Sequence, residues 1–196
     1  MKTAPTRKLF AYWNARRGSR PAPERGDIEP GAIRDILGDS FIVTFDAEAG
    51  HPFRLAGTRV CSLFGRELRG EPFVRLWDDA DRDVVGGLVA MVADEAVAVV
   101  AGANARTPEG ARADLELLLL PLYHRGRTHG RLLGVLAPIA APYWLGAQHI
   151  GALTLGTIRH LGPVVASLSV PKTVADSPAE AGRLRRGFTV YDGGRN

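Results

Sequence analysis

Hydrophobic residues alternate with other residues along two neighbouring stretches of the chain, 40–45 and 53–55, with a turn-forming segment (46–50) between them. A period of two that is rich in aromatic and β-branched side chains is typical of β-strands. On the second stretch, Phe53 and Leu55 are expected to share one face. A single hairpin cannot bury its apolar face alone, so the pattern predicts that later strands close over it.

The rest of the chain predicts further strands and several helices. Apolar residues that recur three or four positions apart indicate helices, with Thr58 and Asp78 as caps and Gly65 as a helix end. The predicted helices cover residues 8–17, 27–37, 59–64, 79–95 and 150–161, and the strands after the hairpin cover 97–105, 113–123 and 131–137. The expected fold class is therefore α+β, with five antiparallel strands.

Alternation along residues 113–123 assigns the two faces of the predicted sheet. Leu117 lies on one face, and Leu118 and Leu120 lie on the other. A sheet with one wet face would carry polar residues along that face, so the second face needs a cover. The helix at 8–17 offers an apolar stripe for this purpose, and a second copy of the same sheet is the alternative. The predicted partner or dimer surface consists of Leu9, Tyr12, Trp13, Leu118 and Leu120.

Two acidic residues, Asp114 and Glu116, alternate onto one face of the same strand. We interpret both as part of a solvated or salt-bridged face, with Arg54 and Arg131 as candidate partners from other strands. Carboxylates at such positions are more often paired or hydrated than chemically active.

Composition fits one domain of ordinary size with terminal extensions. Of the 196 residues, 45% are hydrophobic, which is enough for a sizeable core. The formal net charge of +4 comes largely from arginines near the two ends. That distribution indicates solvated ends and not the basic stripe of a nucleic-acid-binding face. The expected organisation is a flexible N-terminus (1–8), an N-terminal helical cap (9–38), the sheet domain with a C-terminal helix (39–165) and a disordered basic tail (166–196).

Several features are typical of a cytoplasmic protein. Cys61 is the only cysteine, so no intrachain disulfide can form. The first residues lack the apolar core of a signal peptide. Residues 132–158 carry no formal charge, but Pro138, Pro142 and several glycines indicate a buried strand, a loop and a soluble helix instead of a membrane span. We expect a cytoplasmic protein that binds neither membrane nor nucleic acid.

Three segments in this order resemble the PAS fold, and specifically a bacterial single-domain PAS family (PAS family 5). They are Tyr12–Pro30, Phe53–Gly70 and Leu117–Pro138. The resemblance implies a five-stranded antiparallel sheet with helices on one face that enclose a small pocket, preceded here by the N-terminal helices. Residues 39–165 would then be a PAS-like sensor domain, which implies a cytoplasmic signalling or regulatory module.

The residues with which some PAS domains hold cofactors are missing here. Cys61 lies about where flavin-binding light sensors keep their reactive cysteine, but Val60 precedes it and residues 62–64 do not supply the arginine and glutamine of those sensors. Haem-binding PAS domains use a histidine on the long helix, and residues 78–95 contain none. The histidines of the chain show no metal-ligand spacing, and no hydrolase, phosphate-loop or dinucleotide motif occurs. We expect no cofactor, no metal and no catalytic residue.

Arg16 and Arg20 stand four residues apart, a spacing that can bind phosphate in cyclic-dinucleotide receptors of the PilZ type. The second motif of those receptors (Asp or Asn, then Ser, then Gly) is missing. The alternative interpretation is that both arginines pair with Asp27 or Glu29, or that they cap the end of the helix.

These observations lead to a hypothesis of a sensory or regulatory domain, a homodimer that binds a partner protein and signals by protein contact. It would also bind a small apolar ligand between the sheet and the helices. The expected ligand pocket is lined by Phe53, Leu55, Phe64, Trp77, Leu88, Leu117 and Val135. Two alternatives are a non-catalytic scaffold with a filled core and an enzyme on a nuclear-transport-factor-like cone, which needs a histidine–aspartate pair in its pocket.

Overall fold

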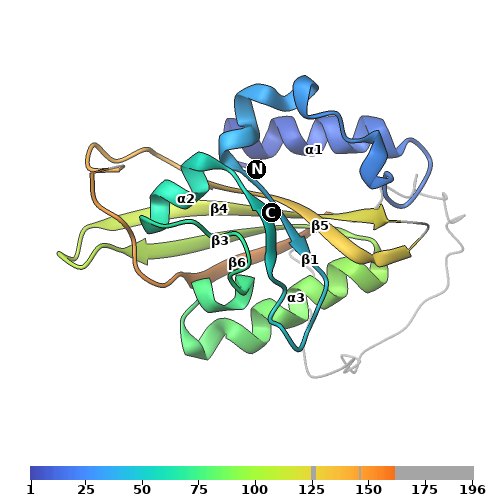
Figure 1. Cartoon of the computed structure of the whole chain (residues 1–196). Coiled ribbons are helices and arrows are strands. Elements are labelled where there is room, and N and C mark those ends of the chain that lie inside the picture. Colours follow the sequence, from blue (N-terminus) through green and yellow to red (C-terminus); the bar gives the residue numbers. More distant parts are fainter. Residues whose placement is uncertain (125–126, 146, 162–196) are drawn as a thin grey trace, which may run out of the picture. The chain divides into compact units, whose positions relative to one another are not determined.

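The computed structural model describes residues 1–124, 127–145 and 147–161. These residues form a six-stranded antiparallel sheet in the order β2-β1-β5-β4-β3-β6, with helices on both faces (Figure 1). The strands are β1 (Ser40–Thr44), β2 (Phe53–Ala56), β3 (Ala98–Arg106), β4 (Arg112–His124), β5 (Arg127–Pro138) and β6 (Thr154–Leu161). The helices are α1 (Ala4–Arg17), α2 (Thr58–Phe64), α3 (Arg82–Glu95) and the 3-10 helices η1 (Arg25–Asp27), η2 (Pro30–Asp39), η3 (Phe73–Leu76) and η4 (Asp79–Asp81). The predicted α+β class is confirmed, with one strand more than expected.

Buried side chains form a separate core on each face of the sheet. We call the face toward α2 and α3 the inner face and the face toward α1 and η2 the outer face. Along β4, Leu117 and Leu119 belong to the inner core, while Leu118 and Leu120 belong to the outer core. This confirms the predicted alternation, because successive side chains of a strand point to opposite faces.

The β1–β2 hairpin forms as predicted, but Leu55 does not share a face with Phe53. A register shift lies between Ile42 and Val43, so that Val43 pairs with Phe53 and Ile42 pairs with Leu55. Phe53 is buried in the inner core, whereas Leu55 lies opposite an outer-face residue and is 49% exposed. The extra residue of a β-bulge reverses the alternation, which a strict period of two cannot anticipate.

Val135 was also expected on the inner face, and this prediction is wrong. Val135 on β5 pairs with Leu118 on β4, and residues directly opposite each other in a sheet share a face. Val135 therefore belongs to the outer core, and its neighbour Leu136, which pairs with Leu117, faces the inner core. The alternation along β5 could be predicted from the sequence, but its register against β4 could not.

The predicted C-terminal helix at 150–161 is instead strand β6, which pairs with β3 along the edge of the sheet. Leu155 on β6 pairs with Ala103 on β3, and Ile158 pairs with Ala101. Two residues of β6 therefore lie opposite the single residue Gly102 of β3, which is a β-bulge. This bulge places both Leu155 and Ile158 against the inner core although they are three positions apart. The resulting three-residue spacing imitates the period of a helix.

The N-terminal region also differs in detail from the prediction. Helix α1 begins at Ala4, inside the segment predicted as flexible (1–8), because Thr3 caps it and Pro5 suits its first turn. The second predicted helix is the 3-10 helix η2. The tail predicted as disordered, 166–196, lies outside the described residues.

Candidate functional site

The outer face of the sheet is covered by α1 (Figure 1). Leu9 and Trp13 are buried in the outer core, which also contains Leu118 and Leu120. The indole Nε1 of Trp13 donates a hydrogen bond to the carbonyl oxygen of Pro121 on β4, at 2.9 Å. Four of the five residues predicted for a partner surface are thus already buried against one another inside the chain.

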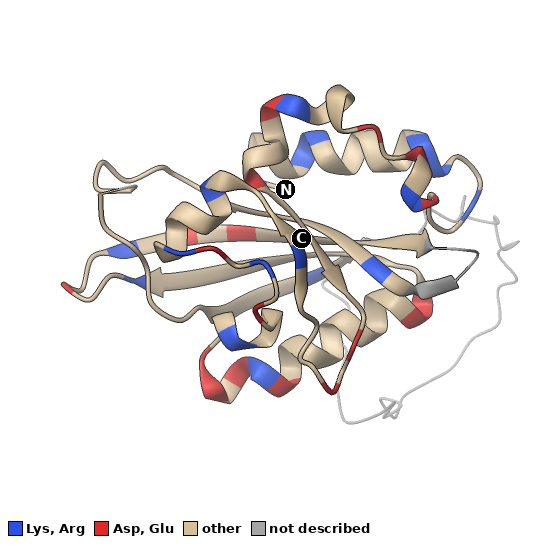
Figure 2. Ribbon diagram, in the orientation of Figure 1, with Lys and Arg blue, Asp and Glu red and all other residues tan. Residues whose placement is uncertain are grey.

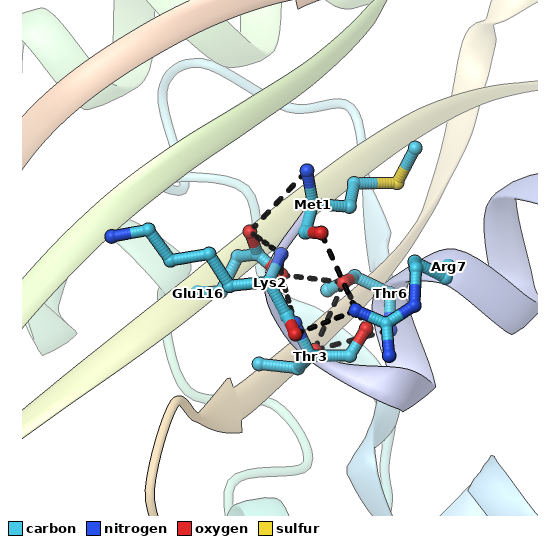
Figure 3. A network of polar contacts seen from close by, with 6 residues as sticks. All are labelled: Met1, Lys2, Thr3, Thr6, Arg7 and Glu116. Atoms are coloured by element: carbon cyan, nitrogen blue, oxygen red, sulfur yellow. Dashed lines mark hydrogen bonds and ion pairs between the residues drawn. The ribbon is translucent and has the colours of Figure 1, made fainter.

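The start of α1 is anchored to the sheet by the carboxylate of Glu116 on β4 (Figure 3). The backbone N–H of Lys2 donates to both carboxylate oxygens, to Oε1 at 2.7 Å and to Oε2 at 2.9 Å. Oε2 also accepts hydrogen bonds from the backbone N–H of Thr3 at 2.9 Å and from the hydroxyl of Thr6 at 2.5 Å. The N-terminal ammonium of Met1 lies 3.9 Å from the same group. Glu116 is only 3% exposed, so these donors replace the water that a buried carboxylate needs.

The same contacts change the acidity of Glu116. Burial of the carboxylate raises its pKa, but the hydrogen bonds from Thr3, Thr6 and Lys2 and the nearby terminal ammonium together outweigh burial, so that the pKa of Glu116 is lowered. Glu116 is therefore ionised at neutral pH and binds the start of α1 as a charged acceptor.

The sequence pattern did not identify this role of Glu116, because a carboxylate on a strand commonly faces solvent or an arginine. A signal was present, since Glu116 shares its face with Leu118 and Leu120, which are buried. A charged residue on an apolar face requires a partner, and the partners are contributed by residues more than 100 positions away.

Tyr12 lies at the edge of the outer core. Its hydroxyl accepts a hydrogen bond from the backbone N–H of Glu29 at 2.8 Å, which ties α1 to the segment before η2. The guanidinium groups predicted to bind phosphate are paired with carboxylates, Arg16 with Glu29 at 3.3 Å and Arg20 with Asp27 at 2.7 Å. Figure 2 shows acidic and basic residues interspersed along this part of the chain. The structure thus supports ion pairing, the second of the two interpretations of these arginines.

The model of the PAS domain family matches residues 1–137, which is more than half of the chain. The chain belongs to the PAS domain family. Members of this family are sensory and regulatory domains and are typically non-catalytic. The matched range ends in β5, so β6 lies outside it.

Solved structures of PAS domains resemble the chain in part. One is the PAS domain of an HTR-like protein from Haloarcula marismortui, with 16% identity and a TM-score of 0.39 over 55% of this chain and 90% of that one. Another is the PAS domain of a protein from Colwellia psychrerythraea, with 16% identity and a TM-score of 0.40 over 56% of this chain and 97% of that one. Comparison with functionally curated proteins finds no match.

The inner core of this PAS domain contains a cluster of aromatic side chains. The ring centroid of Phe73 lies 5.6 Å from that of Phe41, 5.7 Å from that of Phe53 and 6.1 Å from that of Trp77. Such edge and offset contacts hold aromatic rings in fixed positions. Five of the residues predicted to line a ligand pocket lie in this core: Phe53, Phe64, Trp77, Leu88 and Leu117. They pack against their neighbours, and Leu55 and Val135 lie elsewhere.

The remaining sequence predictions concern Cys61, a metal site and a membrane span. Cys61 is buried in α2 as part of the inner core. Within the described residues, His, Cys, Asp and Glu side chains form no group of three or more that could hold a metal ion. No helix in the described ranges is long and apolar enough to cross a membrane.

Proposed function

We propose that this PAS domain regulates a partner protein through contacts made by α1 and the outer face of the sheet. The observation that carries the proposal is the separation of the two cores by the sheet. Because α1 packs only on the outer core, α1 can change its contacts while the inner core stays intact. Such a change would uncover Leu118 and Leu120, an apolar surface suited to a partner or to a second copy of the domain.

Protein contact is the proposed signal. The centroids of neighbouring aromatic rings in the inner core lie 5.5 to 6.1 Å apart. This close packing favours a filled core over a ligand pocket on that face. We further propose that the domain is non-catalytic, acts in the cytoplasm and forms a homodimer through the outer face. In this scheme α1 has two alternative arrangements, packed on its own sheet or engaged with a partner.

The experiment that tests this proposal releases α1 without touching the inner core. Trp13→Ala removes a buried indole of α1 from the outer core, together with its hydrogen bond to the carbonyl oxygen of Pro121. We expect faster hydrogen exchange in α1 and an altered association state by light scattering, while the amides of α3 keep their protection. Equal loss of protection in α1 and α3, or an unchanged association state, would contradict the proposal.

Val85→Ala is the matched control variant, because Val85 is buried on α3 on the opposite side of the sheet. This substitution should lower the unfolding midpoint by the usual amount for a truncated core residue. It should leave the association state unchanged.

A further inference from the structure

A second site, separate from the Glu116 network, lies where η2 crosses the outer face near the sheet edge. A cavity of about 340 Å³ opens there between η2, β1, β2 and β5. Its apolar lining comes from Ile28, Ile33, Leu37, Ile42, Leu55 and Leu133. The volume falls within the range of small-molecule sites, and a largely apolar lining with few polar groups is typical of them. Leu55, which the sequence pattern assigned to the core, is exposed and forms part of this lining.

Arg25 contributes the charged group of this cavity. Its Nε is buried and has no hydrogen-bond partner. Among the described residues, no carboxylate pairs with its guanidinium, in contrast to Arg16 and Arg20 in the same region. A buried donor of a cation that lacks an acceptor is costly, and an anionic ligand would remove that cost. The planar guanidinium suits a carboxylate, which can accept two parallel hydrogen bonds.

The walls of the cavity are held in place by contacts of η2 with the residues that follow β2. Gly57 lies so close to η2 that a Cβ there would come within 2.1 Å of the carbonyl oxygen of Leu37. Arg59 on α2 binds the carboxylate of Asp39 with hydrogen bonds of 2.8 and 2.6 Å. Preformed walls reduce the ordering that a ligand must bring about when it binds.

We propose that this cavity binds an amphipathic carboxylate of the fatty-acid class, with its alkyl chain along the apolar lining and its carboxylate at Arg25. The proposal goes beyond the regulatory function proposed above and stands independently of it, because the cavity does not include Trp13, Leu118 or Leu120. The hydroxyl of Ser40, which also lines the cavity, already donates to the carbonyl of Ile36 at 2.8 Å. Arg25 is thus the group that would select an anion.

The test is isothermal titration calorimetry of the full chain with octanoate, decanoate and dodecanoate below their micelle concentrations. We expect affinity to rise about fourfold for each methylene that enters the apolar lining. Decanol and decylammonium should bind at least about tenfold more weakly than decanoate, because decanol has no negative charge to pair with Arg25 and decylammonium has no hydrogen-bond acceptor.

Variants separate this site from unspecific binding. Arg25→Gln should weaken decanoate about tenfold or more and leave decanol unchanged. Arg34→Gln is the matched control on the exposed side of η2 and should have no effect. Leu55→Gln, at an exposed position of the lining, should weaken decanoate and decanol alike. Absence of binding, equal affinity for decylammonium, or equal effects of Arg25→Gln and Arg34→Gln on decanoate would each overturn the proposal.

Discussion

The carboxylate of Glu116 and the hydroxyl of Thr6 lie 2.5 Å apart, although 110 residues separate them in the chain. The contact joins strand β4 to the first turn of helix α1. Since Thr6 is fully buried, the contact is shielded from competing water. This relationship makes α1 an integral part of the folded domain and gives it a specific attachment point.

Removal of that attachment should loosen α1. Glu116→Ala leaves the backbone N–H groups of Lys2 and Thr3 without their acceptor, so we expect the free energy of unfolding to fall by about 1–3 kcal/mol. Glu116→Gln keeps one oxygen acceptor and should cost less. Urea denaturation measures both values, and hydrogen exchange should locate the change in α1.

Asp114→Ala is the control for Glu116, because Asp114 lies on the same face of β4 and is exposed. A stability loss in this variant as large as in Glu116→Ala would show that the role assigned to Glu116 is wrong.

The hydrogen bond between Trp13 and Pro121 can be tested apart from the packing of the indole. Trp13→Phe keeps an aromatic ring in the outer core but leaves the carbonyl oxygen of Pro121 without its donor. We expect a loss of about 1–3 kcal/mol in the free energy of unfolding, measured by urea denaturation. Tyr143→Phe changes a side chain that is 99% exposed and should have no measurable effect. A Trp13→Phe variant as stable as the parent would contradict this assignment.

His51 predicts a pH dependence of stability. Burial lowers the pKa of His51, while the charge of Asp46 opposes this effect only in part. The folded protein therefore resists protonation of His51, whereas the unfolded chain gains this proton near the ordinary histidine pKa of about 6.5. The stabilisation is present above that value and is lost as the pH falls through it toward the lowered pKa of the folded state.

The variant His51→Asn tests this explanation, because asparagine tolerates the positive φ of 59° at this position and does not titrate. Between pH 7 and pH 5, the unfolding free energy should fall more steeply in the parent protein than in the variant, by denaturation at a series of pH values. Parallel curves would exclude His51 as the source.

Gly134 on β5 should not accept a side chain. It pairs with Phe41 on β1, and a Cβ at Gly134 would come within 2.2 Å of the Phe41 ring. Gly134→Ala should therefore lower the unfolding free energy by about 1–3 kcal/mol through overpacking. Gly87→Ala provides a control of opposite sign, since Gly87 lies within α3 with open space around it and alanine favours helix by about 0.5–1 kcal/mol. Similar effects of the two substitutions would contradict this account.

Local hydrophobic patterns were sufficient to predict which side chains are buried where a helix or strand is regular throughout. The leucines of β4 and the aromatic stripe of α1 were assigned to the correct sides of the sheet from spacing alone. The same reasoning failed at Leu55, Leu155 and Ile158, each next to a bulge. A bulge depends on the partner strand as much as on the strand that contains the pattern.

For this protein, the sequence by itself determined the class of fold, the order of most elements and the need for a cover on the outer face. These features follow from hydrophobic periodicity, which is a property of each segment alone. Only the tertiary structure decided the pairing register that turns Val135 outward, the sixth strand, the burial of Glu116 and the cavity beside Arg25. Each of these depends on which distant segments meet, and that choice is made by the packing of the whole domain.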